Sequence, residues 1–299
     1  MSGNSELGFR ELLQRSIVDS IKIENTVILK GQYRTAYDLL KDSIESNVTP
    51  CLVGPPGVGK SLLARKISED TARGFHEVFF DENMTPSRLI GAFDPALVVR
   101  QGRTVDSFEP GPLMRSMIEG GIFVAHELNR ATEFCQNSLI APLEERHYHL
   151  YPFGMVKAND NFAFIATQNP IETSGTYRLS RVLVDRIGCW IRLTYPDKET
   201  EIEILKVNAP AMDMPDSVLS KIYEIVNDTR FNQDLEIPAS PRAGIFLTRL
   251  VNRYGERFDN VNDAIRFFAP SVLSKEMRVR DPSKTVKSII EEILDKRLG

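Results

Sequence analysis

The chain has 299 residues, of which 42% are hydrophobic and 26% charged, with a formal net charge of −4. This length allows one large α/β domain or two smaller ones, and the weakly acidic, mixed charge gives no reason to expect nucleic acid as a partner. No apolar run approaches the ~20 residues that cross a bilayer, and the polar start lacks the core of a signal peptide, so we expect a cytoplasmic protein. Cys51, Cys135 and Cys189 lie far apart without metal-ligand spacing, which fits reduced thiols.

Short apolar runs alternate with helical stretches through the first two thirds of the chain. Helical spacing covers 33–46, and the strand-like runs are 51–54, 76–81, 121–126, 162–167 and 189–195. Five such runs separated by helices favour a mostly parallel sheet with both faces covered. From residue 197 onward the periodicity is almost wholly helical. We therefore expect an α/β domain over 1–196 and a smaller helical domain over 197–299.

The segment GPPGVGKS at 54–61 matches the phosphate-binding pattern G-x-x-x-x-G-K-[ST], with a short strand before it and a helix after it. Its glycines let the backbone wrap around a polyphosphate, whose charge meets backbone amides and the positive end of the helix. Lys60 is expected to reach the β- and γ-phosphates, and the Ser61 hydroxyl to ligate Mg²⁺. The predicted nucleotide-binding residues are Gly54, Pro55, Pro56, Gly57, Val58, Gly59, Lys60, Ser61 and Leu62.

Polar residues stand at the ends of later strand-like runs. In a parallel sheet, ligands gather outside the carboxyl ends of the strands. Glu127, after 121–126, can polarise an attacking water, and Asn169, after 162–167, can orient that water or touch the γ-phosphate. A solvated helix-start acid and an Asn-Pro turn are the alternatives. The joint placement of the two residues favours a function.

The segment 144–162 alternates apolar and polar residues around Pro-Phe-Gly, which predicts a hairpin ahead of the run at 162–167. Its exposed histidine and tyrosine side chains are candidates for client contact or for packing against neighbours. His147 and His149 share one face of this hairpin and could ligate a metal, but no third ligand is evident nearby, so this interpretation is not favoured.

Several stretches resemble the AAA+ ATPases of the MoxR branch. They are LVGPPGVGKS, PGPLMRSMIEGGIFVAHELNRATEFCQNSLIAPLEER, FAFIATQNPIETSGTYRLSRVLVDR, LTYPDKETEIEIL and SPRAGIFL. The resemblance implies a P-loop AAA+ core followed by a helical lid, assembled as a homo-oligomeric ring, usually a hexamer. It also implies ATP-driven remodelling or maturation of a protein client, commonly with a partner that carries a von Willebrand factor A (VWA) domain. The segments 81–98 and 144–162 correspond to parts that related rings place near the central pore.

The resemblance also implies roles for single residues. Gly54 to Ser61 become the Walker A loop, Glu127 the Walker B catalytic acid and Asn169 the first sensor. Arg242, in SPRA, falls at the second sensor, at the start of a lid helix, where its charge can report hydrolysis as a lid movement.

The same resemblance expects an arginine finger near the last strand. Arg186, in VDR just ahead of that strand, occupies its place, with Arg178 and Arg181 as rivals. Arginine suits this role because its charge is permanent and its fork can grip phosphate oxygens.

His126 departs from the family pattern, which has an acid there that contacts Mg²⁺-bound water. Histidine brings no negative charge, and Mg²⁺ prefers oxygen ligands. Three interpretations remain. The ring hydrolyses ATP with a higher metal requirement, with His126 contacting the ion indirectly through water; it binds ATP but turns over slowly; or it favours Mn²⁺ or another softer ion. We prefer the first, because Glu127, Asn169, Arg186 and Arg242 would have no shared reason to occur in an inactive site.

Two other functions compete with an ATP-hydrolysing chaperone. One is a nucleotide-gated assembly scaffold with little turnover. The other is a DNA-acting motor, against which stand the net charge of −4 and the lack of a dense basic stripe.

Overall fold

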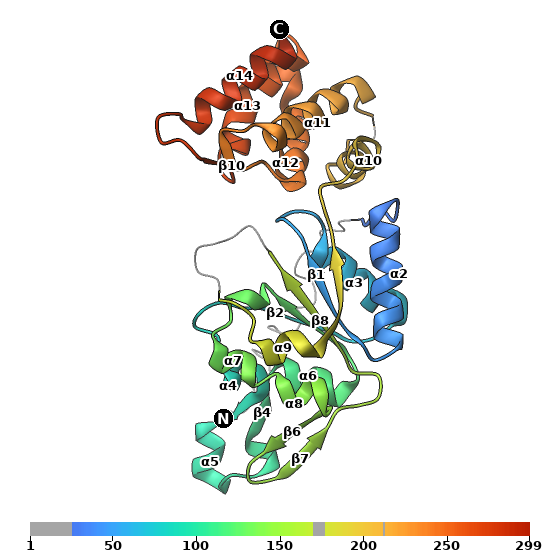
Figure 1. The fold of residues 1–299 in the computed structure, drawn as a ribbon, viewed down its shortest axis with the longest axis vertical. Coiled ribbons are helices and arrows are strands. Elements are labelled where there is room, and N and C mark those ends of the chain that lie inside the picture. Colours follow the sequence, from blue (N-terminus) through green and yellow to red (C-terminus); the bar gives the residue numbers. More distant parts are fainter. Residues whose placement is uncertain (1–25, 170–176, 212) are drawn as a thin grey trace, which may run out of the picture.

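The computed structural model describes residues 26–169, 177–211 and 213–299. An α/β part (residues 26–192) lies below a helical part (residues 198–299), and the chain crosses from one to the other after the last strand of the sheet (Figure 1). Within the described residues, no helix combines the length and the apolar character needed to cross a bilayer.

The α/β part contains a five-stranded sheet in the order β2-β5-β8-β1-β9, and all of its pairings are parallel. Its strands are β1 (Thr49–Val53), β2 (Phe75–Phe79), β5 (Ile122–His126), β8 (Ala163–Gln168) and β9 (Ile187–Arg192). Each contains or overlaps one of the five runs expected from the sequence. The predicted sheet is therefore confirmed, with strand ends shifted by up to three residues.

Alternating side chains of the central strands fill two hydrophobic clusters, one on each face of the sheet. On β5, Ile122 and Val124 pack with α2 (Gln32–Glu45) and α3 (Lys60–Thr71), whereas Phe123 and Ala125 pack on the opposite face with α6 (Pro112–Glu119). Side chains alternate along a strand, so any residue of β5 with an even number points towards α3. His126 is one of these even-numbered residues, so its side chain points towards α3.

Shorter elements extend the α/β part at the end opposite the helical part (Figure 1). The antiparallel hairpin β6 (His147–Leu150) and β7 (Gly154–Lys157) confirms the one predicted over 144–162. It adjoins the antiparallel pair of β3 (Gly91–Phe93) and β4 (Phe108–Pro110), because Phe93 of β3 packs against both Phe108 of β4 and Phe153 of the hairpin. The remaining elements are α4 (Pro86–Ile90), α5 (Pro95–Gln101), α7 (Glu133–Asn137), α8 (Ile140–Glu144), α9 (Arg181–Arg186) and the 3₁₀ turns η1 (Val105–Ser107) and η2 (Leu128–Arg130).

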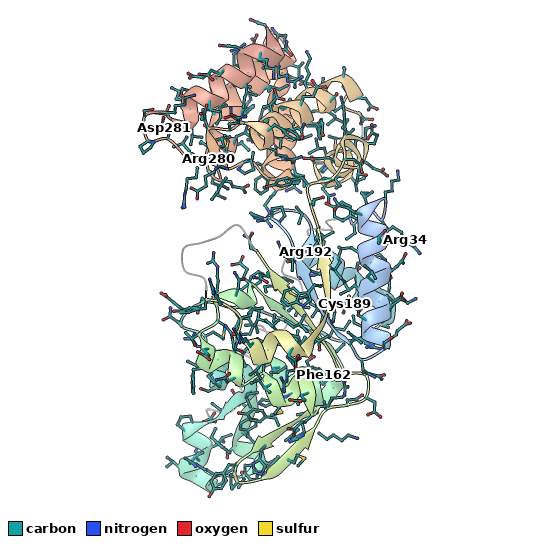
Figure 2. The ribbon with its side chains drawn as sticks, viewed as in Figure 1. Arg34, Phe162, Cys189, Arg192, Arg280 and Asp281 are labelled. Carbon is teal, nitrogen blue, oxygen red and sulfur yellow. The ribbon has the colours of Figure 1, made fainter. Side chains whose placement is uncertain are left out.

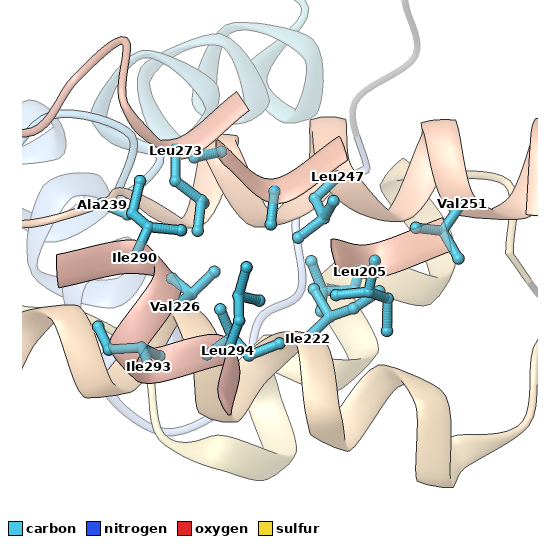
Figure 3. Packing of buried hydrophobic residues seen from close by; sticks show 14 of the residues in the cluster. Leu205, Ile222, Val226, Ala239, Leu247, Val251, Leu273, Ile290, Ile293 and Leu294 are labelled. Carbon is cyan, nitrogen blue, oxygen red and sulfur yellow. The ribbon is translucent and has the colours of Figure 1, made fainter. Parts of the chain in front are cut away.

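The helical part has its own hydrophobic cluster, whose buried residues all lie between Leu205 and Leu294. Figure 3 shows side chains from several helices meeting in this cluster. The helices are α10 (Lys198–Asn208), α11 (Asp216–Phe231), α12 (Pro241–Tyr254), α13 (Val261–Leu273) and α14 (Val286–Leu298). The sequence predicted them, but not the small sheet of β10 (Leu235–Ile237) and β11 (Arg278–Val279), nor the 3₁₀ turn η3 (Gly255–Arg257).

The crossing between the two parts begins where β9 ends, at the labelled Arg192 in Figure 2. On the α/β side, the Gln32 amide binds Thr194 twice, donating to its carbonyl and accepting from its N–H at 3.0 Å each. On the helical side, the Arg230 guanidinium lies 4.3 Å from the ring centre of Tyr195. Arg230 also donates two 2.7 Å hydrogen bonds to Glu201. The crossing is thus held from both ends.

Replacing Arg230 with Ala should lower the free energy of unfolding by about 3–5 kcal/mol, because it leaves Glu201 as a buried, unpaired charge. The two side chains are only 5% and 1% exposed. Denaturant unfolding measures the change. Arg266→Ala is the control, since it breaks an exposed pair with Asp295 and should cost at most about 1 kcal/mol. Equal losses in the two variants would contradict the prediction.

Candidate functional site

The glycine-rich loop leads directly from β1 into α3. Gly57 and Gly59 have φ of 77° and 88°, a conformation that glycine adopts without strain. Lys60, the first residue of α3, folds back over the loop and donates to the carbonyls of Gly54, at 2.6 Å, and Pro55, at 2.9 Å. The first backbone amides of a helix have no partner within it, so the start of α3 offers donors to a bound anion.

A cavity of about 520 Å³ lies between this loop, the strand ends and α12. That volume is within the range of roughly 300–1,000 Å³ typical of ligand pockets. The predicted site residues that line it are Pro56, Gly57, Val58, Gly59, Lys60, Ser61, Leu62, His126, Glu127, Asn169 and Arg242. Gly54 and Pro55, the first two residues of the loop, are not part of the lining, and their carbonyls accept the hydrogen bonds of Lys60. Arg186 is not part of the lining.

The lining of this cavity combines polar and apolar residues. The lining includes the apolar residues Val27, Ile28, Ile204 and Ile245, together with Asn208. The Asn208 side-chain amide donates to the Thr26 carbonyl at 3.2 Å, and the backbone carbonyl of Asn208 accepts from Arg249. Apolar lining residues suit a planar base, and the glycine-rich loop suits phosphates.

Glu127 leaves the end of β5 in a left-handed backbone conformation, with φ of 54°. Such a conformation is costly for a residue with a side chain, and strained backbone of this kind gathers at functional sites. The Glu127 N–H donates to Thr167 Oγ1 at 3.2 Å, and its carboxylate pairs with Arg130 at 2.6 Å. Asn169 is buried at the end of β8 and lines the same cavity. The structure thus brings the two strand-end residues together.

His126 is buried at the tip of β5, between the loop and the neighbouring strand. Its Nδ1 lies 3.3 Å from Ser61 Oγ, and its Nε2 lies 3.0 Å from Glu77 Oε2. Phe79 stacks on the imidazole at 4.4 Å with an angle of 19° between the rings. The other Glu77 oxygen binds Arg65 at 2.9 Å. The hydrogen bond from His126 and the charge of Arg65 hold the pKa of Glu77 below its ordinary value despite partial burial.

Sequence reasoning missed Glu77, which also lines the cavity. The sequence offered one signal. Glu77 is an acid in a strand-like run, spaced two residues from both Phe75 and Phe79. Because Phe75 packs with the cluster on the α3 face, Glu77 and Phe79 point to that face as well. Only the pairing of β2 with β5, however, reveals that this face adjoins His126.

The arginines occupy different environments. Arg242 lies at the start of α12, exposed within the cavity lining, as expected for its predicted position. Arg186 ends α9 and binds Glu144 through Nε at 3.0 Å and a terminal nitrogen at 2.5 Å. Arg178 and Arg181 are exposed, and neither forms an ion pair with any described residue. No group of three or more potential metal ligands occurs among the described residues, so His147 and His149 gain no third ligand there.

Comparisons with known proteins show which proteins this chain resembles. The model of the AAA domain, dynein-related subfamily, matches residues 50–187. Chaperone MoxR1 of Mycobacterium tuberculosis is 33% identical over 156 residues, 52% of this chain and 38% of that protein. These matches confirm the resemblance to MoxR-type AAA+ ATPases that the sequence motifs indicate.

Two further comparisons cover more of the chain. Gas vesicle ATPase GvpN2 of Halobacterium salinarum is 25% identical over 262 residues, 82% of this chain and 74% of that protein. The crystal structure of NtrX from Brucella abortus matches with a TM-score of 0.59 and 16% identity, covering 96% of this chain and 65% of that one. The likeness to NtrX shows that the fold is shared.

Gly57 also determines how closely α12 can approach the loop. A Cβ atom at Gly57 would lie 2.9 Å from Ser240 Cβ and Oγ, at the N-cap of α12. We expect Gly57→Ala to weaken ATP binding at least tenfold, because α12 must move away. Gly102→Ala is a matched control, since Gly102 has φ of 78° but open space around its Cβ position. Isothermal titration of both variants with ATP tests this, and equal affinities would contradict it.

Proposed function

We propose that this protein binds and hydrolyses ATP in the cavity between the loop and α12, and that it works as a ring chaperone that remodels a protein client. The observation that carries the proposal is the convergence of Lys60, Ser61, Glu127, Asn169 and Arg242 on one cavity whose lining also includes apolar residues. The match of residues 50–187 to the AAA domain model supports it, as does the name Chaperone MoxR1 of one relative.

Each residue has a role that its position supports. Lys60 and the loop amides bind the phosphates, and Glu127 acts as the general base that takes a proton from the attacking water. Asn169 orients that water, and Arg242 senses the γ-phosphate from the start of α12. Because Arg242 belongs to the helical part, loss of this contact releases α12 from the loop. We propose that residues 1–196 and 197–299 act as the two domains that this movement separates.

The donor set at the strand ends fits a bound Mg²⁺. Ser61 Oγ is an oxygen donor at the start of α3, and His126 Nδ1, 3.3 Å away, can contact a metal-bound water. When bound, the ion would neutralise charge on the phosphate oxygens. A nitrogen here in place of a carboxylate makes Mg²⁺ binding weaker, so we propose that hydrolysis needs a raised Mg²⁺ concentration.

Steady-state hydrolysis, measured against Mg²⁺ and Mn²⁺ concentration, tests the proposal, with His126→Asp as the comparator. We expect hydrolysis in both proteins and a lower Mg²⁺ requirement in His126→Asp. Identical metal dependence would overturn our account of His126. ATP binding without turnover in the parent protein would instead favour the assembly scaffold. That alternative arises because His126 replaces the expected acid.

We propose a homo-oligomeric ring, hexameric in the simplest case, in which Arg186 reaches the ATP site of the next subunit. Arg186→Ala should then lower turnover by about 10³-fold or more without loss of ATP binding. Glu144, which holds Arg186 within its own subunit, must release it on assembly.

Mixed rings make this prediction sharper. Arg186→Ala and Glu127→Gln subunits should each be inactive alone, yet regain activity when mixed, because a Glu127→Gln subunit can supply the missing arginine to an intact site. Arg178→Ala and Arg181→Ala are the comparison variants. If either of them shows this complementation and Arg186→Ala keeps full activity, the assignment moves to that residue.

The client and a VWA-domain partner follow from the resemblance to MoxR-type proteins. The hairpin β6–β7 presents exposed apolar side chains, including Tyr151 and Met155, for contact with a client. Capture with the Glu127→Gln protein and ATP, followed by mass spectrometry, should recover a VWA-domain protein. A control capture without ATP identifies proteins that bind regardless of nucleotide.

A further inference from the structure

Glu77 approaches the metal-binding edge of the sheet from the outer strand β2. Phe79 pairs with His126 across the β2–β5 ladder, which places Glu77 one side-chain step earlier on the same face. Glu77 Oε2 then lies 3.0 Å from His126 Nε2. The contact is built by strand pairing and is not a chance meeting of surface chains.

The hydrogen bond between these residues has a definite direction. An ionised carboxylate can only accept, so the imidazole must carry its proton on Nε2. In the neutral ring this leaves a lone pair on Nδ1, the atom that faces Ser61 Oγ at 3.3 Å. His126 is only 1% exposed, and Phe79 stacks on its ring, so the imidazole cannot turn to solvent instead.

We propose that Glu77 is a positioning residue that fixes the Nε2–H tautomer of His126 and so presents the Nδ1 lone pair to the divalent ion or its water. A carboxylate behind a metal-facing histidine also raises the basicity of the facing nitrogen. The pair thereby replaces part of what a strand-end acid would provide. This inference rests on the proposed function for the presence of the ion, but the tautomer itself does not depend on it.

The test begins with the nucleotide-free protein, labelled with ¹⁵N in its histidine rings. The chain has four histidines, and loss of one pair of signals in His126→Asp assigns the ring of interest. The expected shifts are those of the Nε2–H tautomer in the parent and of a mixture or the Nδ1–H form in Glu77→Ala. Glu77→Gln, which keeps an acceptor oxygen, should lie closer to the parent.

Metal affinity is the second measurement. With ATP present, the free Mn²⁺ signal in electron paramagnetic resonance should show binding that is about 10–100-fold weaker in Glu77→Ala. Glu119→Ala is a matched control, because Glu119 makes a similar 3.0 Å contact with His76, outside the cavity. It should change the His76 ring signals and leave Mn²⁺ binding unchanged.

The outcomes separate this inference from the proposed function. Unchanged His126 shifts in Glu77→Ala would overturn the inference, as would Mn²⁺ binding that Glu119→Ala weakens equally. If the parent binds no Mn²⁺ with ATP, the proposed function fails, while the ring shifts still decide the tautomer. The contact between Glu77 and His126 also matters for the His126→Asp variant, because the new carboxylate would lie beside that of Glu77 and be repelled by it. His126→Asp should bind Mn²⁺ more tightly when combined with Glu77→Gln than alone.

Discussion

Replacing Glu127 with Gln should lower the rate constant for ATP hydrolysis by about 10²–10⁴-fold and leave ATP binding within a few-fold of the parent. The loss corresponds to removal of a general base, because an amide cannot take the proton of the attacking water. Glutamine has nearly the same shape, so the backbone turn at φ of 54° and the N–H contact with Thr167 should persist.

Phosphate release under steady-state conditions and equilibrium binding of ATP measure the two quantities. Glu133→Gln is the matched control, since Glu133 is an exposed acid only six residues away, in the first turn of α7. It should keep parental turnover. Hydrolysis at the parental rate by the Glu127→Gln protein would contradict the role given to Glu127.

Lys60→Ala should weaken ATP binding by about 10–150-fold. Hydrogen bonds to charged groups contribute roughly 1.5–3 kcal/mol, and each 1.4 kcal/mol is about tenfold in affinity. Lys60 already lies over the loop, bound to the carbonyls of Gly54 and Pro55. It can exchange these acceptors for phosphate oxygens with little movement.

Isothermal titration with ATP measures this loss. Lys66→Ala serves as the control, because Lys66 lies on the same helix but pairs with Asp70. It should bind ATP like the parent. Loss of affinity in both variants would point to a general loss of charge around α3, and equal affinity in Lys60→Ala and the parent would remove Lys60 from the phosphate site.

Most of the sheet and the helical part could be predicted from the sequence because their signals are local. The continuous apolar run in Ile122–His126 and the loop pattern before Lys60 each lie within one short stretch of the chain. Contacts between residues far apart in the sequence could be predicted only from a general rule. Glu127 and Asn169 are the example, because the carboxyl ends of parallel strands meet at one edge of the sheet.

Contacts that depend on strand order could not be predicted. Glu77 reaches His126 only because β2 lies next to β5, although 42 residues separate the two strands in the chain. The ion pair of Arg186 with Glu144 likewise depends on how α9 sits beside α8. Neither pairing leaves a periodic signal in the sequence.

The crossing at Thr194 to Pro196 determines what kind of motion ATP hydrolysis can produce. Gln32 fastens Thr194 to the α/β part, and Arg230 fastens Tyr195 to the helical part. Pro196 has a fixed φ, which removes one of the few remaining rotatable bonds. We therefore expect a stiff pivot of two or three torsions that rotates the helices as a rigid body, so that a small displacement beside the phosphates becomes a larger sweep at the far end of α14.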